Sequence, residues 1–143
     1  MDEEVCTEAL IESIFLSGKQ CFIPHFTKTN MKMVKLADLE DYKSLPFDRY
    51  GVRQPIDFMD RQDALETCGL DIVLSPGLGF SKCGLRIGRG MGYYDTFYEK
   101  YRAQWGAFPY TIGLAFSVQM MDEIPCTELD VPLNEIATYE PQN

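Results

Sequence analysis

Two stretches of the chain repeat apolar residues with the period of an α-helix. Residues 7–16 (TEALIESIFL) are apolar at positions 9, 10, 14 and 15, with Thr7 placed to cap the first turn and Gly18 to end the last. Residues 93–105 (YYDTFYEKYRAQW) place Phe97, Tyr101 and Trp105 four residues apart, on one helix face. The pattern predicts two amphipathic helices, and it predicts that the three aromatic residues pack in a core.

Short apolar segments between these helices indicate strands. They are residues 21–24, 31–36, 70–75, 110–116 and 136–139. Residues 70–75 (LDIVLS) form a nearly continuous apolar run, which is typical of a strand buried on both faces. Residues 38–46 and 122–130 are polar connections, and residues 50–55 form a turn. Because strands alternate with helices, we expect an α/β fold with a largely parallel sheet.

The composition excludes several classes of protein. The 143 residues are 45% hydrophobic and 24% charged, which fits one soluble domain. A net charge of −9 argues against a nucleic-acid partner, although a local cationic loop can still hold one nucleotide. Five cysteines without a CxxC pair argue against disulfides and a zinc site, and favour the cytoplasm. The acidic start and the absence of a long apolar run predict neither a signal peptide nor a membrane span.

The segment with the clearest chemistry is a glycine-rich loop, residues 84–92, which leads into the second predicted helix. Gly88, Gly90 and Gly92 occupy alternate positions and can expose backbone N–H groups to an anion. The start of a helix favours the same charge. Arg86 and Arg89 add cations, and a carboxylate follows in the first helical turn. A solvated turn is an equally good interpretation of these residues alone, since the spacing fits neither a P-loop nor a dinucleotide fingerprint.

The wider sequence resembles the 5-formyltetrahydrofolate cyclo-ligase family. The resemblance is carried by residues 76–80 (PGLGF) and 84–95 (GLRIGRGMGYYD), whose ending in Gly-Tyr-Tyr-Asp is specific to that family. Further similarity lies in residues 22–24, 53–55, 70–73, 112–116 and 124–125. The resemblance implies a three-layer, Rossmann-like α/β sandwich. It also implies ATP- and Mg²⁺-dependent cyclisation of 5-formyltetrahydrofolate to 5,10-methenyltetrahydrofolate, with release of ADP and phosphate.

The resemblance also assigns roles to individual residues. The implied ATP-binding residues are Arg86, Ile87, Gly88, Arg89, Gly90, Met91, Gly92, Tyr93 and Tyr94. The implied folate-binding residues are Glu4, Tyr50, Arg89, Gly90, Met91, Gly92 and Tyr93. Arg89 and Tyr94 are the implied catalytic residues, and Asp95 and Asn134 the implied metal ligands. We expect a monomer whose partner is 5-formyltetrahydrofolate, with or without a polyglutamate tail, and no membrane or nucleic acid.

Three departures from the family pattern bear on activity. The chain starts after the family's basic first helix and first strand, so residues 1–143 are expected to be one N-terminally incomplete domain that is less active and less stable than a longer member. Asn134 replaces a metal-binding aspartate, and Met91 stands where lysine or glycine is common. The alternatives are a non-catalytic family member that binds folate or nucleotide weakly, and a generic nucleotide-binding regulator.

Other candidate residues favour structural interpretations. His25 is the only histidine, and a lone histidine after a strand is more often structural than catalytic. Ser75 and Ser81 lack a nucleophile elbow, which argues against a serine triad. Cys83 lies beside the loop without an identifiable partner histidine and is interpreted as incidental.

Overall fold

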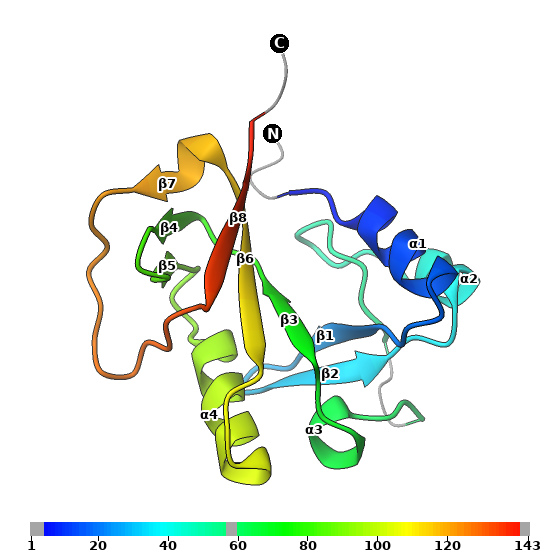
Figure 1. Cartoon of the computed structure of the whole chain (residues 1–143). Coiled ribbons are helices and arrows are strands. Elements are labelled where there is room, and N and C mark those ends of the chain that lie inside the picture. The colour runs from blue at the N-terminus through cyan, green and yellow to red at the C-terminus, as the bar shows by residue number, and fades with distance from the viewer. Residues whose placement is uncertain (1–4, 57–59, 141–143) are drawn as a thin grey trace. The chain divides into compact units, whose positions relative to one another are not determined.

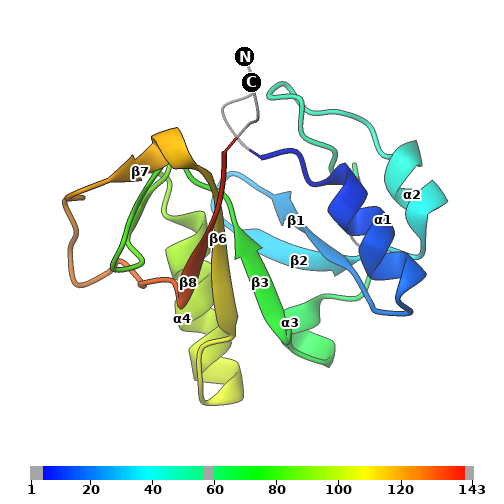
Figure 2. The same cartoon turned by 45° about the horizontal axis from the view of Figure 1, so that its top comes forward.

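The computed structural model of the chain describes residues 5–56 and 60–140, which fall into two compact units. One unit is Thr7–Gly69, and the other joins Leu70–Asn143 to Met1–Cys6. Each unit has its own strands and helices, as Figures 1 and 2 show from two directions. Along the described part of the chain, no helix combines the length and the hydrophobicity needed to cross a bilayer.

The unit Thr7–Gly69 is built on a β-hairpin and three helices. Its elements are α1 (Glu8–Leu16), β1 (Phe22–Phe26), β2 (Met31–Lys35), α2 (Leu39–Ser44) and α3 (Ala64–Thr67). Its core consists of the buried residues Ile11, Cys21, Ile23, Val34, Leu36 and Leu45. The first predicted helix is confirmed as α1, although Thr7 takes the N-cap position without a side-chain hydrogen bond to the helix.

The two strands of this unit form an antiparallel hairpin, which is separate from the parallel sheet of the other unit. β1 and β2 pair with Phe26 opposite Met31. The link between them is closed by Thr27, whose backbone N–H donates to the Asn30 carbonyl at 2.8 Å. A parallel connection needs a crossover of about a dozen residues, so this short link permits only a hairpin.

Helix α2 lies in a stretch that the sequence analysis treated as a polar connection. Asp38 caps it, because its side chain accepts a hydrogen bond from the Asp41 N–H at 2.8 Å. Asp41 in turn accepts two hydrogen bonds from the Arg61 guanidinium, each 2.7 Å long. These bonds from Arg61 hold the pKa of Asp41 below its usual value. Capping and a bidentate ion pair therefore stabilise this short helix, together with Leu39 and Tyr42, which pack against the core of the unit.

The unit Leu70–Asn143 contains two small sheets and one long helix. Its elements are β3 (Ile72–Ser75), β4 (Gly79–Ser81), β5 (Arg86–Ile87), α4 (Tyr93–Trp105), β6 (Tyr110–Phe116), the 3₁₀ turn η1 (Ser117–Gln119), β7 (Met120–Met121) and β8 (Glu135–Tyr139). β6 lies between β3 and β8 in a wholly parallel sheet. In the second sheet, β4 pairs antiparallel with β5 and parallel with β7. The α/β class and the parallel sheet are thus confirmed.

Helix α4 packs its aromatic side chains into the core of this unit. Phe97, Tyr98 and Tyr101 are 2%, 0% and 7% exposed, whereas Trp105 is 44% exposed. The predicted core role is confirmed for Phe97 and Tyr101 but is wrong for Trp105. Tyr98 was not predicted; its hydroxyl group is hydrogen-bonded to the Ser75 hydroxyl of β3. Burial raises the pKa of Tyr98 to about 12.

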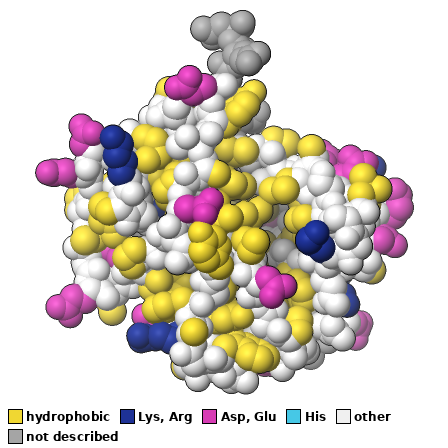
Figure 3. Space-filling view, in the orientation of Figure 1, with side chains coloured by type: hydrophobic (Ala, Val, Ile, Leu, Met, Phe, Trp, Pro, Cys, Tyr) yellow, Lys and Arg dark blue, Asp and Glu magenta, His cyan; other side chains and the backbone are white. Residues whose placement is uncertain are grey.

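The parallel sheet exposes apolar side chains on its other face. Along β3, Val73 and Ser75 are buried while Ile72 is 55% exposed, so the prediction of burial on both faces is wrong for this strand. Tyr110, the first residue of β6, and Tyr139, the last residue of β8, are 46% and 55% exposed. Figure 3 shows hydrophobic side chains over these strands. The third layer of the expected sandwich stays a prediction.

Candidate functional site

The glycine-rich loop begins in a tight turn between β4 and β5. Gly84 donates its N–H to the Ser81 carbonyl at 3.1 Å. Gly84 has φ +88°, and a Cβ at this position would overlap the backbone carbonyl of Leu133. Both the backbone angle and the lack of space therefore require glycine here.

The later glycines of the loop lie at the surface, directly before α4. Gly90 and Gly92 have φ +87° and +65°, and no atom lies within 4 Å of a Cβ built on either residue. Gly92 is the N-cap of α4 and, as a glycine, it offers no capping side chain. The positive dipole end of a thirteen-residue helix thus adjoins a backbone with open space around Gly90 and Gly92, which suits a phosphate.

Arg86, in β5, is enclosed by its own unit. Only 9% of its side chain is exposed, and its Nη2 lies 3.7 Å from Oδ2 of Asp95. The guanidinium carbon is 4.9 Å from the centroid of the Tyr94 ring, and Nη1 donates to the Pro76 carbonyl at 3.4 Å. Nε is buried and has no hydrogen-bond partner among the described residues. A buried guanidinium with an unused donor is a strong partner for a phosphate oxygen.

A short segment before β8, residues 131–134, holds the two ends of this region together; we call it the strap. The Val131 N–H donates to Oδ1 of Asp95 at 3.1 Å. The Leu133 N–H donates to the carbonyl of Gly84 at 2.8 Å. The strap therefore fixes both the start of the glycine-rich loop and the first turn of α4.

The last residue of the strap, Asn134, is tied to the start of β6. Its side-chain oxygen accepts hydrogen bonds from the N–H and the hydroxyl of Thr111, at 2.8 and 3.0 Å. The predicted metal-ligating oxygen is thus engaged within the protein. Among residues 5–56 and 60–140, no group of three His, Cys, Asp or Glu side chains is arranged to hold a metal ion. A metal site would therefore need oxygens from a ligand beside Asp95.

The remaining loop residues differ in exposure. Arg89 is exposed, and Met91 is 63% exposed. Tyr93 is partly buried, whereas Tyr94 is 8% exposed and lies under the Arg86 guanidinium. The structure therefore brings Arg86, Tyr94 and Asp95 together and leaves Arg89 at the surface.

The structure places the three nucleophile candidates that the sequence offered: Ser75, Ser81 and Cys83. Ser75 and Ser81 are completely buried. Ser81 Oγ lies 3.2 Å from the sulfur of Cys83, which is itself an exposed free thiol. All five cysteines are free thiols in this structure. The buried serines agree with the rejection of a serine triad.

Tyr50, a predicted folate contact, belongs to the loop of residues 46–56 in the unit Thr7–Gly69. It is 59% exposed, and the Arg49 guanidinium lies 4.7 Å from its ring centroid. Asp48 shapes this loop, since its Oδ1 accepts hydrogen bonds from the N–H groups of Tyr50 and Val52 at 2.8 and 2.9 Å. Glu4, the other predicted contact outside the glycine-rich loop, lies outside the described residues.

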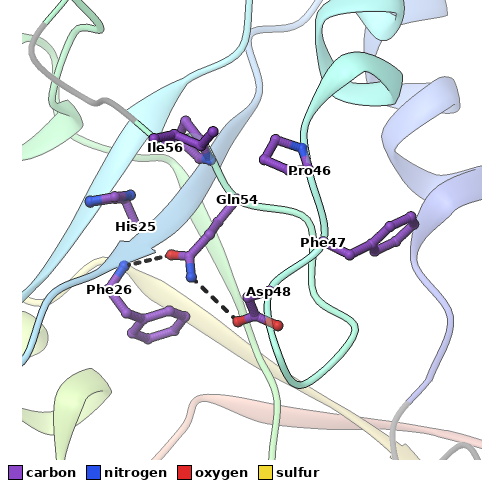
Figure 4. Close-up of a pocket in the computed structure, with 8 residues that line it drawn as sticks. His25, Phe26, Pro46, Phe47, Asp48, Gln54 and Ile56 are labelled. Atoms are coloured by element: carbon purple, nitrogen blue, oxygen red, sulfur yellow. Dashed lines mark hydrogen bonds between the residues drawn. The ribbon is translucent and has the colours of Figure 1, made fainter.

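The same loop closes a pocket that the sequence analysis missed, of about 430 Å³. Figure 4 shows Gln54 in its centre: its side-chain oxygen accepts from the Phe26 N–H at 3.0 Å, and its Nε2 donates to Asp48 Oδ2 at 3.3 Å. The lining residues are His25, Phe26, Pro46, Phe47, Asp48, Gln54, Pro55 and Ile56. His25 is 8% exposed, so it belongs to the wall of this pocket. The polar side chain of Gln54, which lies between turn residues, was the only sign of this pocket that we find in the sequence.

Comparison with known proteins gives a consistent result. The family described as "5-formyltetrahydrofolate cyclo-ligase family" matches residues 1–139. A 5-formyltetrahydrofolate cyclo-ligase of Mus musculus is 43% identical over 138 residues, which are 95% of this chain and 68% of the relative. A probable 5-formyltetrahydrofolate cyclo-ligase of Caenorhabditis elegans is 40% identical, over 93% of this chain and 66% of the relative. This chain thus spans about two thirds of the length of these relatives.

A solved structure shares the fold. The NMR structure of a 5,10-methenyltetrahydrofolate synthetase from Aquifex aeolicus superimposes with a TM-score of 0.66, covering 94% of this chain and 62% of that one. The two sequences are 22% identical, so this likeness supports the architecture alone.

Proposed function

This chain belongs to the 5-formyltetrahydrofolate cyclo-ligase family, and on that premise we propose that it catalyses the ATP- and Mg²⁺-dependent conversion of 5-formyltetrahydrofolate to 5,10-methenyltetrahydrofolate, with release of ADP and phosphate. The names of its relatives support the folate reaction. The glycine-rich loop and its arginines support the dependence on a nucleotide.

The observation that carries the proposal is the enclosed Arg86 beside the start of α4. Its buried Nε has no partner among the described residues, and its side chain is 9% exposed. Gly90 and Gly92 leave the adjoining backbone accessible. These donors converge from a strand, a loop and a helix terminus, which is an arrangement suited to the phosphates of a nucleotide.

The protein contributes positioning and charge in this reaction. ATP, when bound, supplies the phosphoryl group that turns the formyl oxygen on N5 into part of a good leaving group, so that N10 can close the ring. Arg86, Arg89 and the backbone N–H groups of residues 88–92 would orient the phosphates and neutralise the charge that develops on their oxygens. Tyr94 would act by supporting the Arg86 guanidinium. No protein nucleophile is needed.

The residues present fit a magnesium ion that binds together with phosphates. Mg²⁺ is usually held by one or two carboxylates, with phosphate oxygens and water completing the set. Asp95 supplies one carboxylate in the first turn of α4. We propose Asn134 as a second, uncharged ligand. It belongs to the strap, whose Val131 N–H donates to Asp95.

The folate would be recognised by aromatic and backbone groups. Tyr50 is exposed and carries Arg49 near its ring, so it can offer its ring to the pterin by stacking. Glu4 and loop residues 89–93 complete the proposed contacts. We further propose that the protein is a cytoplasmic monomer, in agreement with its five free cysteines.

A turnover assay tests the proposal directly. The chain is mixed with 5-formyltetrahydrofolate and Mg-ATP, and 5,10-methenyltetrahydrofolate is followed by its absorbance. We expect turnover that requires both ATP and Mg²⁺ and that falls strongly in Arg89→Ala. Arg102→Ala is the matched control, because Arg102 is a half-exposed residue paired with Glu99 at 2.6 Å, outside the proposed site. Absence of turnover in a folded chain that is saturated with both substrates would refute the enzyme.

One observation favours a second candidate, a family member that binds nucleotide without turnover. Asn134 carries no charge, and its oxygen is held by two hydrogen bonds from Thr111. A weakened metal site would leave the arginines able to bind ATP. In the same assay this candidate predicts nucleotide binding by calorimetry without production of 5,10-methenyltetrahydrofolate.

A further inference from the structure

The pairing of Arg86 with Asp95 bears on how a metal ion could reach this site. We propose that Arg86 blocks the Asp95 carboxylate until a nucleotide draws the guanidinium away, so that Mg²⁺ binds with or after ATP and not before it. This inference rests on the proposed function, because it assumes that Asp95 is the metal ligand and that the loop binds phosphates.

Both oxygens of Asp95 have a partner within this unit. Oδ1 accepts the hydrogen bond of the Val131 N–H at 3.1 Å, and Oδ2 lies 3.7 Å from Arg86 Nη2. The carboxylate is 22% exposed and the guanidinium 9% exposed, so water screens this pair only in part. A dication that approaches Oδ2 therefore meets a positive charge held on the same side of the carboxylate, 3.7 Å from this oxygen.

Arg86 cannot leave this position without a replacement partner. Its guanidinium packs on the Tyr94 ring at 4.9 Å and its Nη1 donates to the Pro76 carbonyl at 3.4 Å. Turning away from Asp95 would leave a buried cation unpaired, which is costly. A phosphate oxygen removes that cost, because it can accept from the guanidinium, whose movement would also free the buried, unpartnered Nε to donate. The same event exposes Oδ2 of Asp95 to a metal that bridges the phosphates.

The first test measures Mn²⁺ binding by electron paramagnetic resonance in the absence of nucleotide and folate. We expect weak binding to the unaltered chain and binding about tenfold tighter in Arg86→Gln, a ratio that corresponds to about 1.4 kcal/mol. Arg102→Gln removes the same charge from the same unit, where Arg102 pairs with Glu99, and should bind Mn²⁺ as the unaltered chain does. The gain should disappear in the double variant Arg86→Gln/Asp95→Asn.

The second test uses the unaltered chain, so it decides the matter even if Arg86→Gln does not fold. The Nε–H resonance of Arg86 is followed by ¹⁵N NMR while ATP or Mg²⁺ is added singly. We expect ATP alone to shift this resonance and Mg²⁺ alone, at the same concentration, to leave it unchanged.

Two results would overturn the inference: Mn²⁺ affinity unchanged in a folded Arg86→Gln, or a gain that survives the loss of the Asp95 carboxylate. A shift of the Arg86 resonance by Mg²⁺ alone would also overturn it. Failure of the proposed function looks different. It would appear as absent turnover or absent ATP binding in the unaltered chain, whereas the Mn²⁺ titration needs neither ligand.

Discussion

Replacing Gly84 with alanine tests how firmly the strap anchors the glycine-rich loop. Gly84 sits at φ +88° where its Cα faces the Leu133 backbone, and its carbonyl accepts the Leu133 N–H at 2.8 Å. A methyl group therefore meets an unfavourable backbone angle and occupied space at once. The strap would have to move away from the loop to admit it.

The cost follows from these contacts. A left-handed backbone angle costs an alanine about 1–2 kcal/mol relative to glycine. Overpacking against a fixed backbone adds about 1–3 kcal/mol. The strained hydrogen bond from Leu133 contributes about 1 kcal/mol. We expect Gly84→Ala to lower the free energy of unfolding by about 3–6 kcal/mol, a large share of the stability of a typical domain.

Gly90→Ala is the matched control. Gly90 has nearly the same backbone angle, φ +87°, but no atom lies within 4 Å of a Cβ built there. Only the backbone strain remains, and part of it is offset by the lower entropy of the unfolded alanine chain, so we expect a loss of about 1 kcal/mol. If Gly90 lies against phosphate, this variant should in addition lose affinity for ATP.

Urea unfolding followed by circular dichroism measures both variants, with the slope m checked for constancy. Calorimetry with ATP then separates stability from nucleotide binding. Equal unfolding midpoints for Gly84→Ala and Gly90→Ala would show that the strap yields freely, and the reasoning from the Leu133 contact would be wrong.

Three further changes probe charge, metal and burial. Arg89→Ala should weaken ATP binding about 10- to 100-fold, as expected for the loss of charge-assisted hydrogen bonds. Its melting temperature should change little, because Arg89 is exposed. Unchanged ATP affinity with a large fall in melting temperature would contradict this role. Asn134→Asp can keep both hydrogen bonds from Thr111 while adding charge, so it should lower the Mg²⁺ concentration for half-maximal turnover, and no change would remove Asn134 from the site. Tyr98 has a folded pKa of about 12, above the unfolded value of about 10. The unfolded chain therefore loses this proton first, and stability should fall as pH rises through that interval, by about 2 kcal/mol at its upper end. Tyr98→Phe should lack this alkaline loss in urea titrations, and parallel pH curves for the two proteins would argue against the burial effect.

The elements that the sequence predicted well are those defined by their own side chains. Helix α4 begins and ends where predicted. Its thirteen residues carry an aromatic face, and they are bounded by Gly92 and Gly106, both with positive φ. Strand β6 likewise matches its apolar run. Helix α2 was missed because part of its stability comes from Arg61, twenty residues beyond Asp41, and no local pattern records such a pair.

The composition of the candidate site stays a prediction, and its geometry was not foreseen. Glycine spacing and the family signature are what point to the loop residues. They did not reveal that Arg86 turns inward to Asp95, because one lies on β5 and the other on α4. The pocket around Gln54 was missed for a similar reason, since its key hydrogen bond joins residues 28 positions apart. Sequence periodicity does not determine which distant segments of the chain come into contact in the fold.

The strap also has a consequence for how this unit opens in solution. Its N–H groups donate to Asp95 on α4 and to Gly84 at the start of the loop, and Asn134 donates to the Thr111 carbonyl on β6. A segment that shares its hydrogen bonds among three elements must release all of them together when it detaches, so the amides of Val131, Leu133 and Asn134 should exchange with deuterium as one cooperative group. Any ligand that holds the glycine-rich loop would then slow exchange as far away as the first residues of β8.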